Sequence, residues 1–183
     1  MTKVWVIGLS RTGTTSITKL LNNYALLRID HFPSLKSLNG YWYPNDGASD
    51  IPVSFMYKEL DRKHPNSKFI LTKREKESWL TSTENFITTK DRLKSERGVE
   101  LNPDTLMMRE KIYGSQSFDR ETWSNGYDTY HADVREYFAN RPSNLLEIDF
   151  VTGNGVPKDV FEFLGITTIP PKKFPKVNVG APK

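Results

Sequence analysis

Cysteine is missing from this sequence: none of its 183 residues is a cysteine. Its absence excludes disulfide bonds, thiolate metal sites, iron–sulfur clusters and a cysteine nucleophile. Histidine is scarce as well, with three in the chain, and no grouping of them is typical of a metal site. The sequence therefore predicts a function that needs no metal, in a protein compatible with the reducing cytoplasm, and we expect a cytoplasmic location.

Long hydrophobic runs and a strong excess of one charge are also lacking. The apolar run nearest the N-terminus is Val4–Ile7, whereas a membrane span needs about 20 apolar residues and a secretory signal needs a longer apolar segment. The 26 Lys and Arg stand against 22 Asp and Glu, a net charge of +4, and most lie among acidic residues. We therefore expect no membrane partner and no nucleic-acid partner.

The order of apolar patterns predicts a single α/β domain over residues 1–183. Short apolar runs at 3–7, 26–29, 68–72 and 145–148 are typical of buried strands. Between them, apolar residues recur at helical spacing, in helices beginning near Thr14, near Pro52 and before Trp79, and again around Tyr127–Phe138. This alternation predicts a three-layer α/β/α fold, with a central parallel β-sheet covered by helices on both faces.

Two segments carry no regular period. Residues 30–51 contain Pro33, Gly40 and Pro44, and we predict a long, functional loop there. Residues 170–183 hold four of the chain's 11 prolines and four lysines, which predicts an extended tail.

The first chemical signal is the segment Gly8–Ser16, which reads GLSRTGTTS between a predicted strand and a predicted helix. Glycines, hydroxyl groups and a helix N-terminus together favour an anion site, although the same residues also occur as ordinary helix caps. The usual P-loop pattern requires a lysine where this chain has Thr14, which argues against an ordinary ATPase or kinase. The positive charge of this loop is Arg11.

The second signal follows the strand at 68–72. Arg74 comes after that strand, and Ser82 lies eight residues later, about two turns into a helix. An arginine fork and a hydroxyl suit a second, separate phosphate group. An exposed helix with ion pairs explains the same residues, so this motif alone decides nothing.

Taken together, these motifs resemble those of sulfotransferases that use 3′-phosphoadenosine-5′-phosphosulfate (PAPS). The similarity extends through 127–144 to the C-terminal segments 163–165 and 174–178, and so covers nearly the whole chain. The resemblance implies a P-loop-NTPase-like fold, PAPS as the sulfuryl donor, adenosine 3′,5′-bisphosphate (PAP) as the product and no metal. It also implies a set of donor-binding residues: Arg11, Thr12, Gly13, Thr14, Thr15 and Ser16 at the 5′-phosphosulfate, with Arg74 and Ser82 at the 3′-phosphate. The tail lysines Lys172, Lys173 and Lys176 are further candidates at the 3′-phosphate, and they equally suit a solvated tail.

Such a reaction needs a positive charge at the transferred group and a base for the acceptor. We assign the first role to Arg11. Two residues are candidates for the base: Asp50, which matches an acidic residue of related proteins, and His31, with Asp50 ranked slightly ahead. Asp50 also suits a helix N-cap, and His31 equally suits a solvated loop residue.

The predicted acceptor is a hydroxyl of a small molecule, covered by the loop at 30–51. The aromatic run 41–43 suits an apolar pocket for a phenol, and it equally suits ordinary anchors of that loop. The alternative function is a nucleotide-dependent phosphotransferase of kinase type. It requires a magnesium-binding Asp after a buried strand, whereas Lys73 and Arg74 follow the strand at 68–72. The sequence leaves the acceptor and the oligomeric state open.

Overall fold

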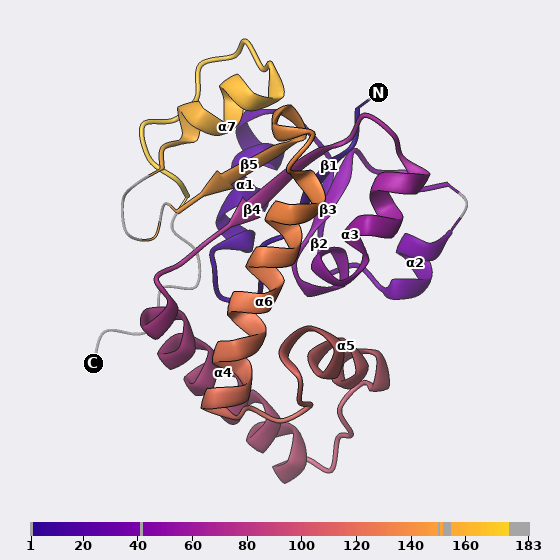
Figure 1. Ribbon diagram of the computed structural model, residues 1–183, viewed down its shortest axis with the longest axis vertical. Helices are drawn as coiled ribbons and strands as arrows, with labels where there is room; N and C mark the ends of the chain where they lie inside the picture. The colour runs from indigo at the N-terminus through magenta and orange to yellow at the C-terminus, as the bar shows by residue number, and fades with distance from the viewer. Residues whose placement is uncertain (1, 41, 150, 152–154, 176–183) are drawn as a thin grey trace. The chain divides into compact units, whose positions relative to one another are not determined.

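A computed structural model of the chain describes residues 2–40, 42–149, 151 and 155–175 (Figure 1). The chain forms two compact units. The first, called the sheet unit, comprises Met1–Lys73 and Pro142–Lys183, and the second, called the helical unit, comprises Arg74–Arg141.

The sheet unit is built on five strands. They are β1 (Val4–Val6), β2 (Ile29–His31), β3 (Gly47–Ser49), β4 (Lys68–Thr72) and β5 (Leu145–Ile148). All neighbouring pairs are parallel, and their order across the sheet is β2-β3-β1-β4-β5. The parallel α/β sheet expected from the sequence is confirmed, and its carboxyl edge carries the segments that follow β1, β2 and β3.

Helices cover both faces of this sheet, as predicted. On one face, Val4 and Val6 of β1 pack in a core with buried residues of α1 (Thr14–Tyr24) and α7 (Pro157–Leu164). Trp5, which lies between those two valines, points to the other face because side chains alternate along a strand. There its ring lies 5.4 Å from that of His64, the residue that ends α3 (Ile51–Lys63).

The predicted loop at 30–51 is wrong in its middle part, since it contains a helix and a strand. Helix α2 spans Leu35–Asn39, and β3 lies between β2 and β1 in the sheet. Strand β2 also begins three residues later than expected. The sequence of β3 is Gly-Ala-Ser, which has no β-branched or aromatic residue, so pairing with two neighbours rather than strand propensity fixes it.

The helical unit consists of α4 (Lys76–Glu96), α5 (Pro103–Tyr113) and α6 (Arg120–Phe138). Its core is aromatic: the rings of Tyr113 and Trp123 stack with centroids 4.0 Å apart, and Trp79 packs on Tyr127 at 4.7 Å. Arg109, buried at 3% exposure, donates to Asp91 at 2.7 Å. Asn102 is the N-cap of α5, because its side chain accepts from Asp104 N–H.

None of the helices in the described part of the chain combines the length and apolarity needed to cross a bilayer. In the predicted tail, residues 170–175 form neither helix nor strand. The rest of that tail, which includes Lys176, lies outside the described residues.

Candidate active site

The loop that connects β1 to α1 lies at the carboxyl edge of the sheet and depends on Gly8. A Cβ at this position would lie 1.7 Å from Thr72 Oγ1, at the end of β4. Thr12 Oγ1 donates to Leu9 O at 2.6 Å and is also 2.6 Å from Thr72 Oγ1, so the Thr72 hydroxyl donates in that pair. Because Gly8 has no side chain, the loop packs directly against the end of β4.

The turn of the loop presents Arg11. This residue has φ 72°, a left-handed conformation that costs a non-glycine residue about 1–2 kcal/mol. Gly13, at φ 100°, is the N-cap of α1, so no hydroxyl stands at the cap position itself. The Ser10 and Thr14 hydroxyls donate to Asp50, and the Thr12 hydroxyl donates to Leu9 O. Anion binding by this loop stays a prediction.

Asp50 joins β3 to α3 and binds the loop. Its carboxylate accepts from Ser10 Oγ at 2.7 Å, Thr14 Oγ1 at 3.2 Å and Ile51 N–H at 2.7 Å. The residue is 8% exposed and has φ 81° and ψ −174°, a region that is essentially reserved for glycine. Asp50 is thus a helix N-cap and a ligand of the loop at the same time.

His31, the last residue of β2, lies beside Asp50. Its Nε2 is 3.5 Å from Asp50 Oδ2 and 3.1 Å from Thr15 Oγ1, and its Nδ1 is 2.9 Å from Ser49 Oγ. The side chain is 35% exposed, so the ring is both anchored and open to a ligand. The two candidates for the base, treated as alternatives from the sequence, form one cluster with the loop.

Sequence reasoning gave no role to two hydroxyl residues of this cluster. Ser49 Oγ lies 2.7 Å from Thr18 Oγ1, which in turn donates to Thr14 O at 3.0 Å. Both side chains are buried. A signal was present, because Thr14 and Thr18 stand four residues apart on one face of a helix.

Two of the predicted donor-binding residues use their polar groups inside the loop. Thr12 directs both its amide and its hydroxyl to Leu9 O, and Ser16 N–H donates to Gly13 O at 2.9 Å. These groups shape the loop. Their contact with a donor molecule stays a prediction.

Arg74 and Ser82, the predicted ligands of a second phosphate, belong to the helical unit. Arg74 Nε donates to Ser78 Oγ at 2.9 Å, and Tyr127 Oη donates to Arg74 O at 2.6 Å. Glu75 caps α4 through Ser78 and Glu77 N–H, which lowers the pKa of that carboxyl below its ordinary value. Ser82 lies on the second turn of α4 and is half-buried. The segment that follows Arg74 is therefore fixed, while phosphate binding by Arg74 and Ser82 stays a prediction.

Of the aromatic run 41–43, considered above for an acceptor pocket, Tyr43 is inaccessible to a ligand. Tyr43 is fully buried and packs against Trp5 at 5.5 Å. Its hydroxyl donates to Asp30 Oδ2 at 2.6 Å, and burial together with this carboxylate raises the pKa of Tyr43 well above its ordinary value. Tyr43 is thus an anchor of the loop, the second of the two alternatives that the sequence left open. Trp42 is 73% exposed, and Tyr41 lies outside the described residues.

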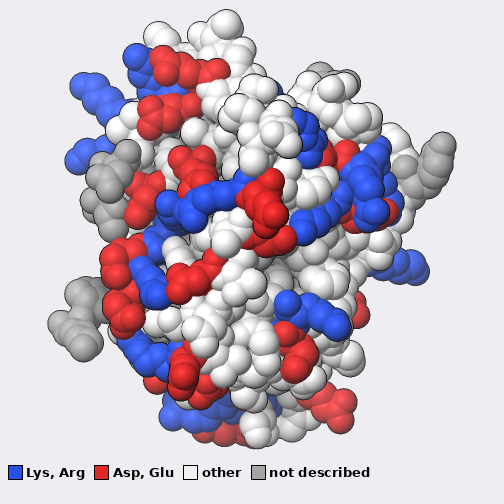
Figure 2. All heavy atoms as spheres, in the orientation of Figure 1, with Lys and Arg blue, Asp and Glu red and all other residues white. Residues whose placement is uncertain are grey.

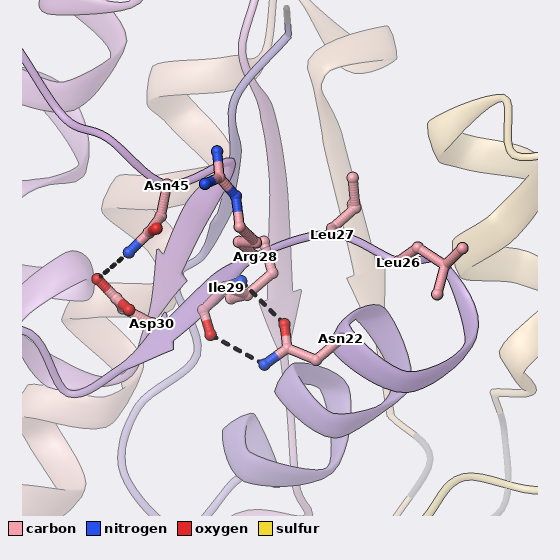
Figure 3. A pocket seen from close by; sticks show the side chains of 7 residues that line it. All are labelled: Asn22, Leu26, Leu27, Arg28, Ile29, Asp30 and Asn45. Atoms are coloured by element: carbon pink, nitrogen blue, oxygen red, sulfur yellow. Dashed lines mark hydrogen bonds between the residues drawn. The ribbon is translucent and has the colours of Figure 1, made fainter.

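A pocket of about 470 Å³ opens at the opposite edge of the sheet, where β2 and β3 begin (Figure 3). Asn22 bridges the N–H and C=O of Ile29 there, and Asn45 donates to Asp30 (Figure 3). The strands carry the catalytic candidates at their carboxyl ends, so this pocket lies away from them. The complete lining is Asn22, Leu26, Leu27, Arg28, Ile29, Asp30 and Asn45.

The fold and this loop define a P-loop-like α/β protein with Thr14 at the position of the usual P-loop lysine and with Arg11 as the positive charge of the loop. The sulfotransferase domain family model matches residues 33–182, and the chain belongs to the sulfotransferase family. A sulfotransferase crystal structure from Alicyclobacillus acidocaldarius has a similar fold, with a TM-score of 0.58 at 14% identity over 97% of this chain and 87% of that one. No curated protein matches the chain significantly.

Proposed function

We propose that this sulfotransferase moves the sulfuryl group of PAPS to a hydroxyl of a small molecule, such as a phenol, without a metal ion. The observation that carries the proposal is the loop between β1 and α1. It presents Arg11 from a strained turn beside a helix N-terminus whose N-cap is the glycine Gly13. Such a terminus and a permanently charged guanidinium suit a phosphosulfate group.

In this reaction the acceptor oxygen attacks the sulfur atom, and the bond from sulfur to the bridging oxygen breaks. The electron pair of that bond leaves with the 5′-phosphate of PAP, and the proton of the acceptor passes to a protein base. Arg11 stabilises the charge that develops on the bridging oxygen and the sulfonate. His31 Nε2 and the Asp50 carboxylate, 3.5 Å apart, are the groups placed to take the proton.

We assign the 3′-phosphate of the donor to Arg74 and Ser82. Arginine binds phosphate with a planar pair of donors, and a hydroxyl adds a further donor. This assignment is tested by comparing PAP with adenosine 5′-monophosphate, which lacks the 3′-phosphate. We expect Arg74→Ala to abolish the advantage of PAP, whereas Arg11→Ala removes transfer but retains that advantage. The reverse result would show that the two arginines are wrongly assigned.

The function is tested by thermal unfolding with PAP in the absence of metal. At a ligand concentration of 100 Kd, binding stabilises the folded state by about 2.7 kcal/mol, which raises Tm by roughly 5–11 °C for a chain of this size. Stabilisation by PAP with EDTA present supports the proposal. Stabilisation by ATP with magnesium only would refute it, and a panel of phenols, alcohols and amines with labelled PAPS then identifies the acceptor.

The alternative, a kinase-type phosphotransferase, gains one observation from the structure. A kinase-type enzyme requires an Asp after a buried strand, and Asp50 is such a residue, since it follows β3 and binds Thr14. The sequence argument against a kinase rested in part on Lys73 and Arg74 and is weaker for this reason. The missing lysine at position 14 still argues against it, because that side chain neutralises the β- and γ-phosphates of a nucleotide.

We also propose a small-molecule partner rather than a nucleic acid, and a cytoplasmic location. On the face drawn in Figure 2, Lys and Arg side chains alternate with Asp and Glu side chains. Ion pairs between such side chains occur among the described residues, such as Arg120 with Glu77 and Glu84. Mixed charge of this kind is typical of a solvated surface.

A further inference from the structure

We propose that Asp50 is a positioning residue that clamps the turn carrying Arg11, and that it is not the proton acceptor. The inference rests on the proposed function. It separates positioning of the loop, assigned to Asp50, from acceptance of the proton, assigned to His31. If it is correct, His31 alone takes the proton of the acceptor.

The first argument is the placement of the contacts made by Asp50. Its carboxylate binds Ser10 on one side of Arg11 and Thr14 on the other. The backbone of Asp50 is held as well, since its N–H donates to Val6 O at 3.3 Å. One buried side chain therefore ties both ends of the turn to the β3–α3 junction, and Arg11 keeps its left-handed conformation between the two ties.

The second argument is strain. Asp50 occupies a glycine-like conformation, which costs about 1–3 kcal/mol and persists only where neighbouring contacts hold it. A plain helix N-cap needs no such backbone, because the N-caps Asn102 and Asp119 are extended. The unusual backbone of Asp50 accompanies the contacts that aim its carboxylate at the loop.

The third argument concerns the capacity of the carboxylate to act as a base. Oδ1 accepts from Ser10 and Ile51 N–H, and Oδ2 accepts from Thr14. With 8% of the residue exposed, an acceptor molecule has little access to these oxygens. The side chain of His31 is 35% exposed, and its Nε2 faces the Thr15 hydroxyl on the loop.

The test compares Asp50→Asn with Asp50→Ala. Asparagine keeps a carbonyl that accepts from Ser10 and Ile51, and its amide donates to the Thr14 hydroxyl, so the clamp survives. Alanine keeps neither contact. Both variants lose the same negative charge beside an anion site, so the coulombic effect on PAP binding cancels in the comparison. Any remaining difference in PAP affinity or hydrogen exchange between the two variants therefore measures the effect of the contacts with Ser10 and Thr14.

Two measurements are made on each variant: amide hydrogen exchange of residues 9–16, and the affinity for PAP by calorimetry. We expect Asp50→Ala to exchange faster in this segment and to bind PAP at least about tenfold more weakly than Asp50→Asn. Ser10→Ala combined with Thr14→Val retains the charge and should reproduce the faster exchange. Adding Asp50→Ala to that pair should cause little further loss, because the three residues form one interaction.

Asp119→Ala is the matched control, since it removes an N-cap whose side chain accepts from Thr122 N–H in the helical unit. It should lower stability and leave exchange in residues 9–16 unchanged. Equal exchange and equal PAP affinity in Asp50→Asn and Asp50→Ala would overturn the proposal, as would wild-type exchange in the Ser10/Thr14 pair. If the wild type does not bind PAP, the proposed function fails, while the exchange measurement still decides on the clamp.

Discussion

Gly8 offers the sharpest test of how the loop is held, because adding a single carbon atom there has a large predicted effect. The Cβ of Gly8→Ala would lie 1.7 Å from Thr72 Oγ1, 2.9 Å from Thr72 Cβ and 2.7 Å from Thr12 Oγ1. Both threonines are fully buried and bonded to each other at 2.6 Å. The loop or the end of β4 must therefore move by more than an ångström, and this hydrogen bond breaks.

The cost has two parts. Overpacking a dense core costs about 1–3 kcal/mol, and leaving a buried hydroxyl unpaired adds about 1–3 kcal/mol. We therefore expect the free energy of unfolding to fall by about 2–6 kcal/mol, a large share of a typical stability of 5–15 kcal/mol. Because the displaced segment is the predicted anion loop, PAP affinity should fall with it.

Urea unfolding followed by tryptophan fluorescence measures this loss, since Trp5, Trp79 and Trp123 are buried. Thr72→Ala in the same chain removes the closest contact and should restore part of the stability. Gly40→Ala is the control, because its Cβ would meet no atom closer than 3.3 Å. A Gly8→Ala variant as stable as the wild type would refute the close packing of this loop against β4.

Three further predictions concern other parts of the molecule. His31→Gln should lower kcat strongly while PAP affinity stays within about twofold, because glutamine can keep the hydrogen bond to Thr15 but cannot take the proton; a weaker affinity with normal kcat would contradict this. Asp91→Ala should reduce the free energy of unfolding by about 3–5 kcal/mol, since it leaves the guanidinium of Arg109, 4% exposed, without its carboxylate partner; a loss under 1 kcal/mol in urea unfolding would argue against that pair. Burial, Lys3 and Lys63 lower the pKa of His64 below 6.5, so the unfolded chain binds this proton more readily and stability should fall as the pH drops below about 6.5. His64→Phe should flatten that decline in unfolding curves measured from pH 7 to 5, and an unchanged slope would assign it to other groups.

Much of the fold could be predicted because its elements carry local signals. The runs at 68–72 and 145–148 are apolar and short, and α1 and α3 show helical spacing. The strand β3 carries no such signal, since Gly-Ala-Ser suits a turn as well as a strand. Its place between β2 and β1 comes from hydrogen bonds to residues far away in the chain, which no local pattern records.

The sequence by itself determined which groups the chain contains: a predicted anion loop that has Thr14 at the P-loop lysine position and Arg11 as its positive charge, no cysteine, and a family resemblance that the comparisons confirm. Only the tertiary structure decided how those groups work together. The end of β3 carries Asp50 to the loop that follows β1, and the end of β2 brings His31 beside it. A contact between residues 36 positions apart, such as Thr14 with Asp50, exists because parallel strands bring their carboxyl ends to one edge of the sheet.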